Sequence, residues 1–465
     1  MHYAWNSVRY SCGIADTRAI TDKSHCRNFP LQPAWQAASI IAFLVLLMSG
    51  PVFPAAPEKD TALDVLSLEN AVAVAIEGNP GLAEMQARAE AMATIPSQAG
   101  TLPDPMVSLG ALNFPTDTFN RDQEPMTQLQ IGIEQSLPFP GKLGLKERAA
   151  EFDADAAASN VDETRLLLVH TVKQTWWQIF YLDRALEIVS RNQDLSRQFV
   201  KIAQVRYKVG EGLQQEVLLA QVELSRLLDR QIELQGLRRQ QVARLNALLD
   251  RSVNTTIVLP EQVEEDLAGI LPEAQLFARA EASRPLLEQR RQEIEAARTR
   301  HDFARRDYYP DFKLGAAYGI RDGDNPDGSS RADFATIRLG MSLPLYAGRK
   351  QDKAVEQSTS ELLQKKYALQ NESGKVQAEI ASALADYQRA SEQVQLYKTG
   401  IIPQARQSVA SMLSGYQVNK VDFLNLVRAQ ITLYDYETQY WKSFSEANQA
   451  LARLTAAVGD EVTDE

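Results

Sequence analysis

Two hydrophobic patterns alternate along this chain, and the first is a strict alternation of apolar and polar residues over short stretches. It occurs around residues 104–137 and again around residues 311–343, for example in Leu129-Gln130-Ile131-Gly132-Ile133. A period of two predicts strands with one apolar and one polar face. The intervening segments, 113–126 and 321–333, are rich in Asp, Asn, Pro and Gly, which is typical of exposed loops.

The second pattern predicts very long helices after each pair of strands. The pattern predicts a long helix, a tight turn and a shorter returning helix over residues 141–249 and again over residues 347–458. The first long helix, predicted to end near Val209, contains no proline, whereas Pro403 should interrupt the second near its end. Seventy helical residues span roughly 100 Å, which exceeds the length of a globular core. The sequence therefore predicts two extended helical hairpins.

The two halves of the chain are copies of one unit. Leu102-Pro103-Asp104 recurs as Tyr309-Pro310-Asp311, and Ser136-Leu137-Pro138 recurs as Ser342-Leu343-Pro344. Several such pairs in the same order at one offset indicate an internal duplication. We therefore divide the chain into a signal peptide (1–56), a first repeat (57–250), an equatorial segment (251–284), a second repeat (285–458) and a C-terminal tail (459–465).

The N-terminal segment has the order of a secretory signal. Ala37–Met48 is the only stretch apolar enough to enter a bilayer as a helix, and it is short for a membrane span. Basic residues precede it, and small residues and prolines follow it up to Ala56. We therefore expect cleavage near Ala56, with an uncleaved N-terminal anchor as the alternative.

Removal of that signal would change the chemistry of the chain. Both cysteines, Cys12 and Cys26, lie within residues 1–56, so the mature chain would have no disulfide and must be held by packing or oligomerisation. Four basic and two acidic residues would also be lost, which takes the formal net charge from −11 to −13. A charge of that sign disfavours nucleic-acid binding.

No set of residues indicates catalysis or cofactor binding. The sequence has no Gly-rich phosphate loop, nucleophile elbow or convergent acid–base set. His170 and His301 stand apart from the clustered ligands that metal sites need, so we expect no metal site and no enzyme activity. The acidic run Glu264-Glu265-Asp266 is interpreted as a solvated loop, and Trp176-Trp177 as a contact between protomers.

The predicted strands cannot form a stable membrane structure in one chain. In lipid only a closed barrel satisfies every backbone group, and four strands are too few to close a barrel with a lumen. Three chains would supply twelve strands, an even number typical of outer-membrane barrels. The apolar face would then contact outer-membrane lipid, and aromatic residues at the ends of the strands would lie at its surface. The polar face would line water with Gln128, Gln130, Glu134, Lys313 and Arg338, and the aromatic residues are Phe139, Tyr308, Tyr309 and Tyr346.

Strand–strand–long hairpin, twice over, resembles the TolC family of outer-membrane efflux proteins. The motifs that carry this resemblance are Arg206-Tyr207-Lys208-Val209-Gly210, Gly415-Tyr416 and the joint Pro138-Phe139-Pro140-Gly141-Lys142. The run Leu102-Pro103-Asp104-Pro105-Met106, with Glu124-Pro125-Met126, is similar to the heavy-metal branch of the CusC and CzcC type.

The resemblance implies a fold class, partners and a function. The fold would be mainly α with a small β part, and a homotrimer would form a 12-stranded β-barrel continuous with a periplasmic α-helical barrel. The trimer would lie in the outer membrane with a long periplasmic extension. It would dock a periplasmic adaptor and an inner-membrane pump of the RND type. Cargo, heavy-metal ions in that branch, would pass through without reacting and without a cofactor.

Polar and charged residues cluster at the two hairpin turns. They are either solvated helix ends or a network that closes the periplasmic mouth of the tunnel. In the second case, Lys420 and Arg428 would meet Glu211 and Glu216 of the same or a neighbouring chain. The resemblance implies acidic side chains in some relatives where this chain has Asn425 and Arg428. The full set of candidates is Tyr207, Gly210, Glu211, Glu216, Tyr416, Asn419, Lys420, Asp422, Asn425 and Arg428.

Other functions remain open at the level of sequence. An outer-membrane duct for type I protein secretion would have the same fold with different cargo. A periplasmic adaptor should have a single hairpin between soluble β-domains, and a coiled-coil fibre should lack the alternating strands. The duplication and the strands with a lipid-compatible face favour the duct over both of these.

Overall fold

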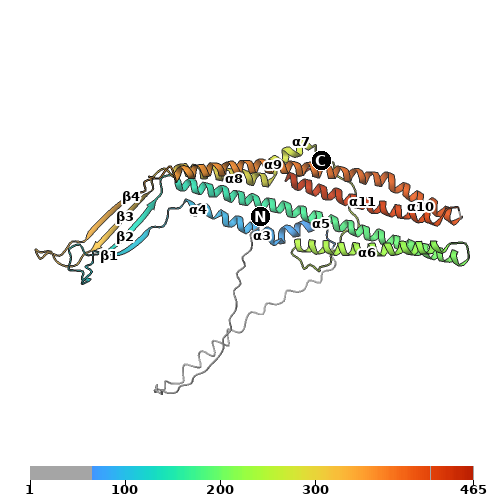
Figure 1. Cartoon of the computed structure of the whole chain (residues 1–465), viewed down its shortest axis with the longest axis horizontal. Helices are drawn as coiled ribbons and strands as arrows, with labels where there is room; N and C mark the ends of the chain where they lie inside the picture. The colour runs from blue at the N-terminus through green and yellow to red at the C-terminus, as the bar shows by residue number, and fades with distance from the viewer. Residues whose placement is uncertain (1–64, 419, 464–465) are drawn as a thin grey trace, which may run out of the picture. The chain divides into compact units, whose positions relative to one another are not determined.

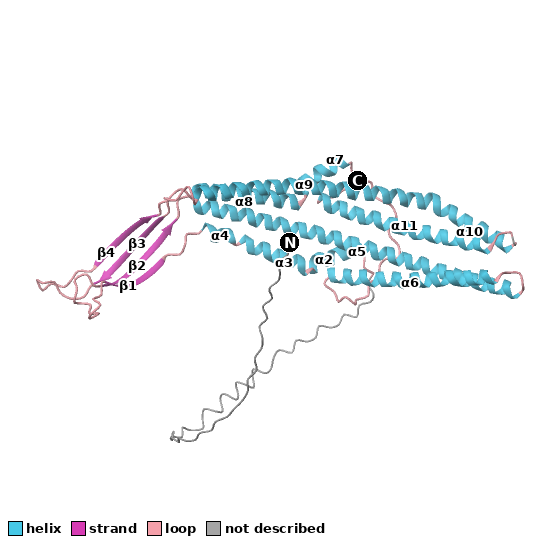
Figure 2. Cartoon of the chain, in the orientation of Figure 1, coloured by secondary structure: helices cyan, strands magenta, loops and turns pink. Residues whose placement is uncertain are grey.

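The computed structural model describes residues 65–418 and 420–463, which belong to one unit that runs from Leu63 to the C-terminus. The predicted signal peptide lies outside these residues. Within the unit, a small sheet lies at one end and two long helical hairpins extend away from it (Figures 1 and 2). The expected fold class, mainly α with a small β part and a duplicated strand–strand–hairpin unit, is confirmed.

All four strands form a single antiparallel sheet. They pair in the order β1-β2-β3-β4, so consecutive strands are neighbours and β1 and β4 are its edges. Each strand pair falls within the alternating stretch that predicted it. The bounds are Met106–Leu112 for β1, Gln128–Leu137 for β2, Phe312–Ile320 for β3 and Phe334–Met341 for β4.

Three short helices lead into the first half, and one very long helix dominates it. Ser67 and Asn79 cap the first two helices, because their side chains accept hydrogen bonds from the backbone amides of Asn70 and Leu82. Gly210, with a φ of +80°, makes the turn into the returning helix as expected. The helices are α2 (Leu68–Gly78), α3 (Pro80–Ala93), α4 (Ile95–Gly100), α5 (Lys142–Lys208) and α6 (Gln214–Leu248).

The second half repeats this arrangement with one irregularity. Proline lacks the amide that would continue the helical ladder, and a π-helical turn, η1 (Tyr397–Ile401), stands just before Pro403. The long helix therefore continues through the proline instead of breaking there. The elements are α7 (Glu273–Ser283), α8 (Pro285–Arg306), α9 (Gln351–Leu396), α10 (Ile402–Gln417) and α11 (Phe423–Val458).

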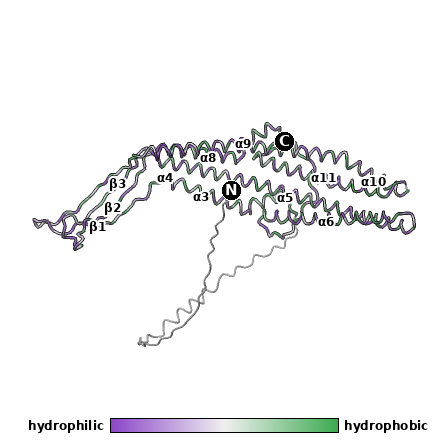
Figure 3. The backbone as a smooth tube through the Cα atoms, in the orientation of Figure 1, coloured by the Kyte–Doolittle hydropathy of each residue, from purple (hydrophilic) through white to green (hydrophobic). Residues whose placement is uncertain are grey.

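The hairpins pack side by side along their length. Helix α5 lies against α6, α8 and α11, and α9 lies against α8 and α11. Figure 1 shows that α3 and α6 follow one another along α5, just as α8 and α11 do along α9. Apolar and polar residues alternate along these helices (Figure 3). None of the described helices is both long and apolar enough to cross a membrane.

The main hydrophobic core lies midway along the hairpins. It includes Trp176, Trp177 and Phe180 of α5, which pack against Phe444 of α11, and Trp176 also donates a hydrogen bond of 3.0 Å to the carbonyl of Leu66. Both tryptophans are less than a tenth exposed within a single chain. The expected contact between protomers is therefore wrong: the pair joins the two repeats of one chain.

Candidate functional site: the sheet face, the joint and the hairpin tips

The five polar strand residues expected to line water share one face of the sheet. The register places Gln130 opposite Gly319, Glu134 opposite Gly315, and Gly315 opposite Arg338. Gln128 lies two residues before Gln130 on β2, and Lys313 lies two residues before Gly315 on β3. The Lys313 Nζ and Glu134 Oε1 atoms are 3.2 Å apart, a partly exposed ion pair that contributes little to stability.

Glycines on this polar face make room for the long side chains. A Cβ atom at Gly319 would overlap Gln128 Oε1, and one at Gly132 would stand 2.9 Å from Ser108 Oγ. Both glycines are buried although they belong to a single sheet layer. Glycine at these positions therefore lets neighbouring polar side chains lie close to the backbone on this face. These glycines alternate with polar residues in the sequence, so the pattern that could have predicted this packing is present there.

The opposite face of the sheet is apolar and largely open. Leu109 of β1 is 81% exposed, Ile337 of β4 is 83% exposed and Leu339 is 73% exposed. Apolar side chains from all four strands stand in adjacent register positions there, for example Leu109 beside Ile131. An apolar surface of this extent on a soluble monomer would be a liability, so it marks a contact with lipid or another protein.

The joint between sheet and helices is held by a buried lysine. Lys142 Nζ donates hydrogen bonds to Asp311 Oδ1 at 2.9 Å, Asp307 Oδ1 at 3.0 Å and the Tyr309 carbonyl at 3.0 Å. Burial lowers the pKa of Lys142, but the hydrogen bonds and charges of both aspartates outweigh that effect and raise it above 10.5. Phe139 stacks on Tyr309 with ring centroids 4.5 Å apart. These two rings, expected to belong to an aromatic girdle, pack against each other.

The two hairpin tips contact each other within one chain. Tyr416, at the end of α10, is buried and lies against Phe423 of α11. The Arg206 guanidinium of α5 stands 4.7 Å from the Tyr416 ring centroid, a cation–π contact, and also donates to the Glu211 carbonyl at 3.3 Å. In the sequence Arg206 stands only within the motif of the first hairpin turn, and it was not among the predicted site residues.

The other candidate residues at the tips differ in their position on the helices and in their exposure. Tyr207, at the end of α5, is half exposed, and Glu216 lies in the first turn of α6. Asp422 directly precedes α11, and Asn425 and Arg428 are exposed on that helix. Burial raises the pKa of the Tyr416 hydroxyl; the charge of Arg206 opposes this, and those of Glu216 and Asp422 add to it. Asn419 lies outside the described residues.

The expected charge pairs between the two tips do not form within one chain. Among the described residues, neither Lys420 nor Arg428 makes an ion pair with Glu211 or Glu216. The contact between the tips is made instead by Arg206 and Tyr416, and Arg428 is exposed on α11. Ion pairs of Lys420 and Arg428 with Glu211 or Glu216 of a neighbouring chain remain a prediction.

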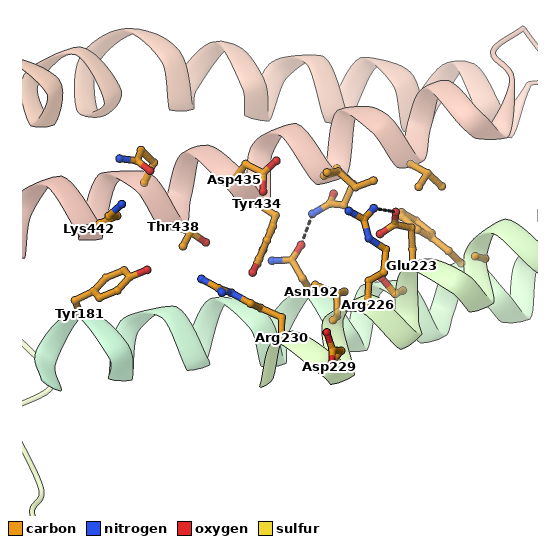
Figure 4. A pocket seen from close by; sticks show the side chains of 18 residues that line it. Tyr181, Asn192, Glu223, Arg226, Asp229, Arg230, Tyr434, Asp435, Thr438 and Lys442 are labelled. Atoms are coloured by element: carbon orange, nitrogen blue, oxygen red, sulfur yellow. Dashed lines mark hydrogen bonds and ion pairs between the residues drawn. The ribbon is translucent and has the colours of Figure 1, made fainter. Parts of the chain in front are cut away.

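A groove of about 580 Å³ lies between the two hairpins, bordered by α5, α6 and α11 (Figure 4). Tyr181, Arg230 and Tyr434 gather at one part of it, and Glu223 pairs with Arg226 at 2.6 Å at another. Burial raises the pKa of Asp435 above its usual value, and the charge of Arg226 partly opposes this. Acids and bases are mixed along the groove without converging on one point. Sequence reasoning missed it because its walls come from different repeats.

Metal ligands do not converge anywhere in the described part of the chain: it contains no group of three or more His, Cys, Asp and Glu side chains arranged to hold an ion. His170 is half buried on α5, and burial lowers its pKa. His301 Nδ1 lies 3.1 Å from the Ser358 hydroxyl. The two histidines are therefore in separate packing environments.

An open apolar sheet face, carried on two long helical hairpins, is the arrangement of an outer-membrane channel protein. Residues 71–251 and 276–460 match the family model described as Outer membrane efflux protein. The chain belongs to this family, and its place is the outer membrane, with a long helical part in the periplasm.

Solved structures of such channels share the fold. The VceC protein of Vibrio cholerae has a TM-score of 0.70 at 18% identity, over 85% of this chain and 96% of that one. The open state of Neisseria gonorrhoeae MtrE has a TM-score of 0.71 at 16% identity, over 85% and 89%. CusC has a TM-score of 0.70 at 16% identity, over 88% and 96%. These three TM-scores differ by no more than 0.01 and do not favour one branch. No curated protein matches the chain.

Proposed function

We propose that three copies of this chain form a passive exit duct for a tripartite efflux system, in which a periplasmic adaptor and an inner-membrane RND pump deliver the cargo. The carrying observation is the sheet, whose apolar face is open and whose two edges have no partner strand among the residues that the structure describes. A sheet with free edges cannot remain in lipid, so several chains must close it.

The polar surfaces support a duct that conducts without reacting. Gln128, Gln130, Glu134, Lys313 and Arg338 share the inward face of the sheet, and both signs of charge are present there. Such a wall is wet and offers no strong preference for one kind of ion. The long hairpins give the adaptor a surface to engage in the periplasm, and energy comes from the pump.

Heavy-metal ions are the cargo that we propose within this class. The support is the similarity of residues 102–106 and 124–126 to the metal-exporting branch. Because the described residues hold no ligand cluster, selection of the metal would belong to the pump or the adaptor.

Two measurements test these proposals separately. Purified protein in planar bilayers should conduct ions with voltage as the only driving force; a protein that never conducts would exclude the duct. In a strain that lacks its own outer-membrane ducts, tolerance to copper or silver should return only when chain, adaptor and pump are produced together. Restored tolerance to organic drugs but not to metals would overturn the cargo and leave the duct standing.

A further inference from the structure

The two edges of the sheet are unpaired, and the internal repeat specifies how they fit together. In the first strand pair Leu109 lies opposite Ile131, and in the second Ala316 lies opposite Ile337. Matching Leu109 with Ala316 and Ile131 with Ile337 gives a shift of 207 positions from β1 to β3 and of 206 from β2 to β4. The sequence motifs 102–104 and 136–138 recur at these same shifts.

Applied to the observed β2–β3 pairing, the same shifts predict which residues of β4 in one copy lie opposite which residues of β1 in the next copy. Within one chain, Glu134 lies opposite Gly315. Adding 206 to the β2 position and subtracting 207 from the β3 position gives Gly340 of one copy opposite Ser108 of the next. The rest of the edge follows as Met341 with Val107, Leu339 with Leu109, Arg338 with Gly110 and Ile337 with Ala111.

This register is chemically consistent along both edges. Leu339, Leu109, Ile337, Met341 and Val107 are all more than half exposed on the apolar face in one chain. In the derived register they meet one another, so the apolar face continues across the boundary between copies. A slip of one residue would place each of them beside a residue of the polar face.

The strand-to-helix joint repeats in the same way. The pair Gly141-Lys142 recurs as Gly348-Arg349, and Asp311 recurs as Asp104. Lys142 is buried against Asp311, whereas Arg349 and Asp104 are exposed and make no ion pair in the chain that the structure describes. Each half of this second joint thus lacks the partner that the first joint has.

We propose that β4 of one copy pairs with β1 of a second copy in this register, and that Arg349 binds Asp104 of that copy as Lys142 binds Asp311. The inference rests on the proposed function, because it assumes that copies close a common sheet. It adds the residues that meet, which similarity of fold does not provide. The second copy is the occupant because it offers an edge of matching length, pleat and charge.

Cysteine crosslinking tests the register in a chain whose own cysteines, Cys12 and Cys26, lie within the predicted signal. Directly opposed strand residues have Cα atoms about 4.5–5.5 Å apart, within the reach of a disulfide, whereas diagonal neighbours lie near its limit. We expect Ser108→Cys with Gly340→Cys to give covalent oligomers on mild oxidation. Ser108→Cys with Arg338→Cys or with Ser342→Cys should give far less.

Controls separate the register from assembly itself. Glu134→Cys with Gly315→Cys, the observed pair within one chain, should oxidise without any change in size. Mass photometry before oxidation shows whether trimers are present; their absence would contradict the proposed function. Trimers that crosslink best at 338 or 342, or at none of the three positions, would overturn the register alone.

Charge exchange tests the joint. Arg349→Glu and Asp104→Arg should each raise the monomer fraction in detergent several-fold, and the double variant should restore the trimer. Lys350→Glu makes the same charge change one residue away and should have little effect. If the double variant is as dissociated as the worse single variant, Arg349 and Asp104 do not meet.

Discussion

Lys142 shows how one buried charge can fix the relation between two repeats. Its ammonium is almost fully buried, and all three of its hydrogen bonds go to residues 307–311, just before β3. An ammonium has three donors, so this site satisfies it completely. The lysine therefore joins the start of the first hairpin to the second strand pair.

Replacement of this lysine should destabilise the protein measurably. Lys142→Met leaves Asp307 and Asp311 without their shared partner, and hydrogen bonds to charged groups contribute about 1.5–3 kcal/mol each. Since both aspartates are more than a third exposed, solvent reduces the total, and we expect a loss of about 1–3 kcal/mol. Thermal unfolding measures it. Lys201→Met, on the exposed side of the same helix, is the control, and equal losses would contradict the argument.

The same joint predicts a dependence on pH. Burial tends to raise the pKa of Asp311, but hydrogen bonds from Lys142 and the Phe139 amide outweigh it and hold the pKa below 3.8. A depressed carboxyl pKa stabilises the fold above the unfolded value, and this contribution is lost as pH falls through the folded value. The raised Lys142 pKa gives a contribution that is lost only above pH 10.5.

The stability difference between the parent and Lys142→Met should therefore be constant through neutral pH. It should shrink as the pH falls below 3.8 and again as it rises above 10.5. Chemical denaturation at a series of pH values measures this difference. A stability difference that is largest in acid would show that it does not come from the ionised aspartates.

The strands could be predicted from the sequence, because a period of two leaves a readable pattern. Leu129 through Ile133 alternate without exception, and the structure places them in β2 with the expected faces. The turn at Gly210 was also predictable, since a positive φ favours glycine. Both features are local, so a single sequence contains enough information to find them.

Features that depend on distant partners could not be predicted in this way. From the sequence alone Lys142 would be expected on the surface, because its partner Asp311 lies far along the chain. Trp176 and Trp177 were assigned to a contact between chains because nothing in their own helix shows that Phe444 covers them. The groove beside Tyr181 and Tyr434 and the contact of Arg206 with Tyr416 likewise require both repeats in position.

Arginine substitutions can test which face of each strand contacts lipid. Arginine at Ile131 or Leu339 should block assembly, whereas arginine at Gln130 or Ser342 should not. A charged side chain on the lipid face costs roughly 2–4 kcal/mol at the middle of the bilayer. Yields of the purified oligomer compare the four variants. Equal yields would mean that the apolar face does not contact lipid.

At the scale of the whole molecule, one chain should not be the functional unit. The sheet has four strands and two open edges, so the purified protein should be a detergent-stable trimer. Mass photometry and chemical crosslinking determine its size. A stable monomer would remove the basis of the barrel, and a dimer would supply too few strands for a lumen.

The periplasmic mouth is expected to be closed by ion pairs between neighbouring chains and not within one chain. Arg206 and Tyr416 join the tips within a chain, so Lys420 and Arg428 remain available to Glu211 or Glu216 of a neighbouring chain. Lys420, Arg428 and Glu211 are exposed and Glu216 is partly buried, and an exposed ion pair contributes at most about 1 kcal/mol. Three-fold symmetry would repeat each pair, giving about 3 kcal/mol and a shift of roughly a hundredfold between open and closed forms.

The adaptor would then need only a comparable preference for the open form to reverse this equilibrium. Arg428→Ser or Glu216→Gln should raise the single-channel conductance or the open probability in planar bilayers, and high salt should reproduce part of the effect by screening the charges. Lys201→Met, exposed on α5 about two turns before the tip, serves as the control for loss of a nearby charge. If both tip variants conduct like the parent at low salt, the closure is steric or apolar, and these charges are only solvated helix ends.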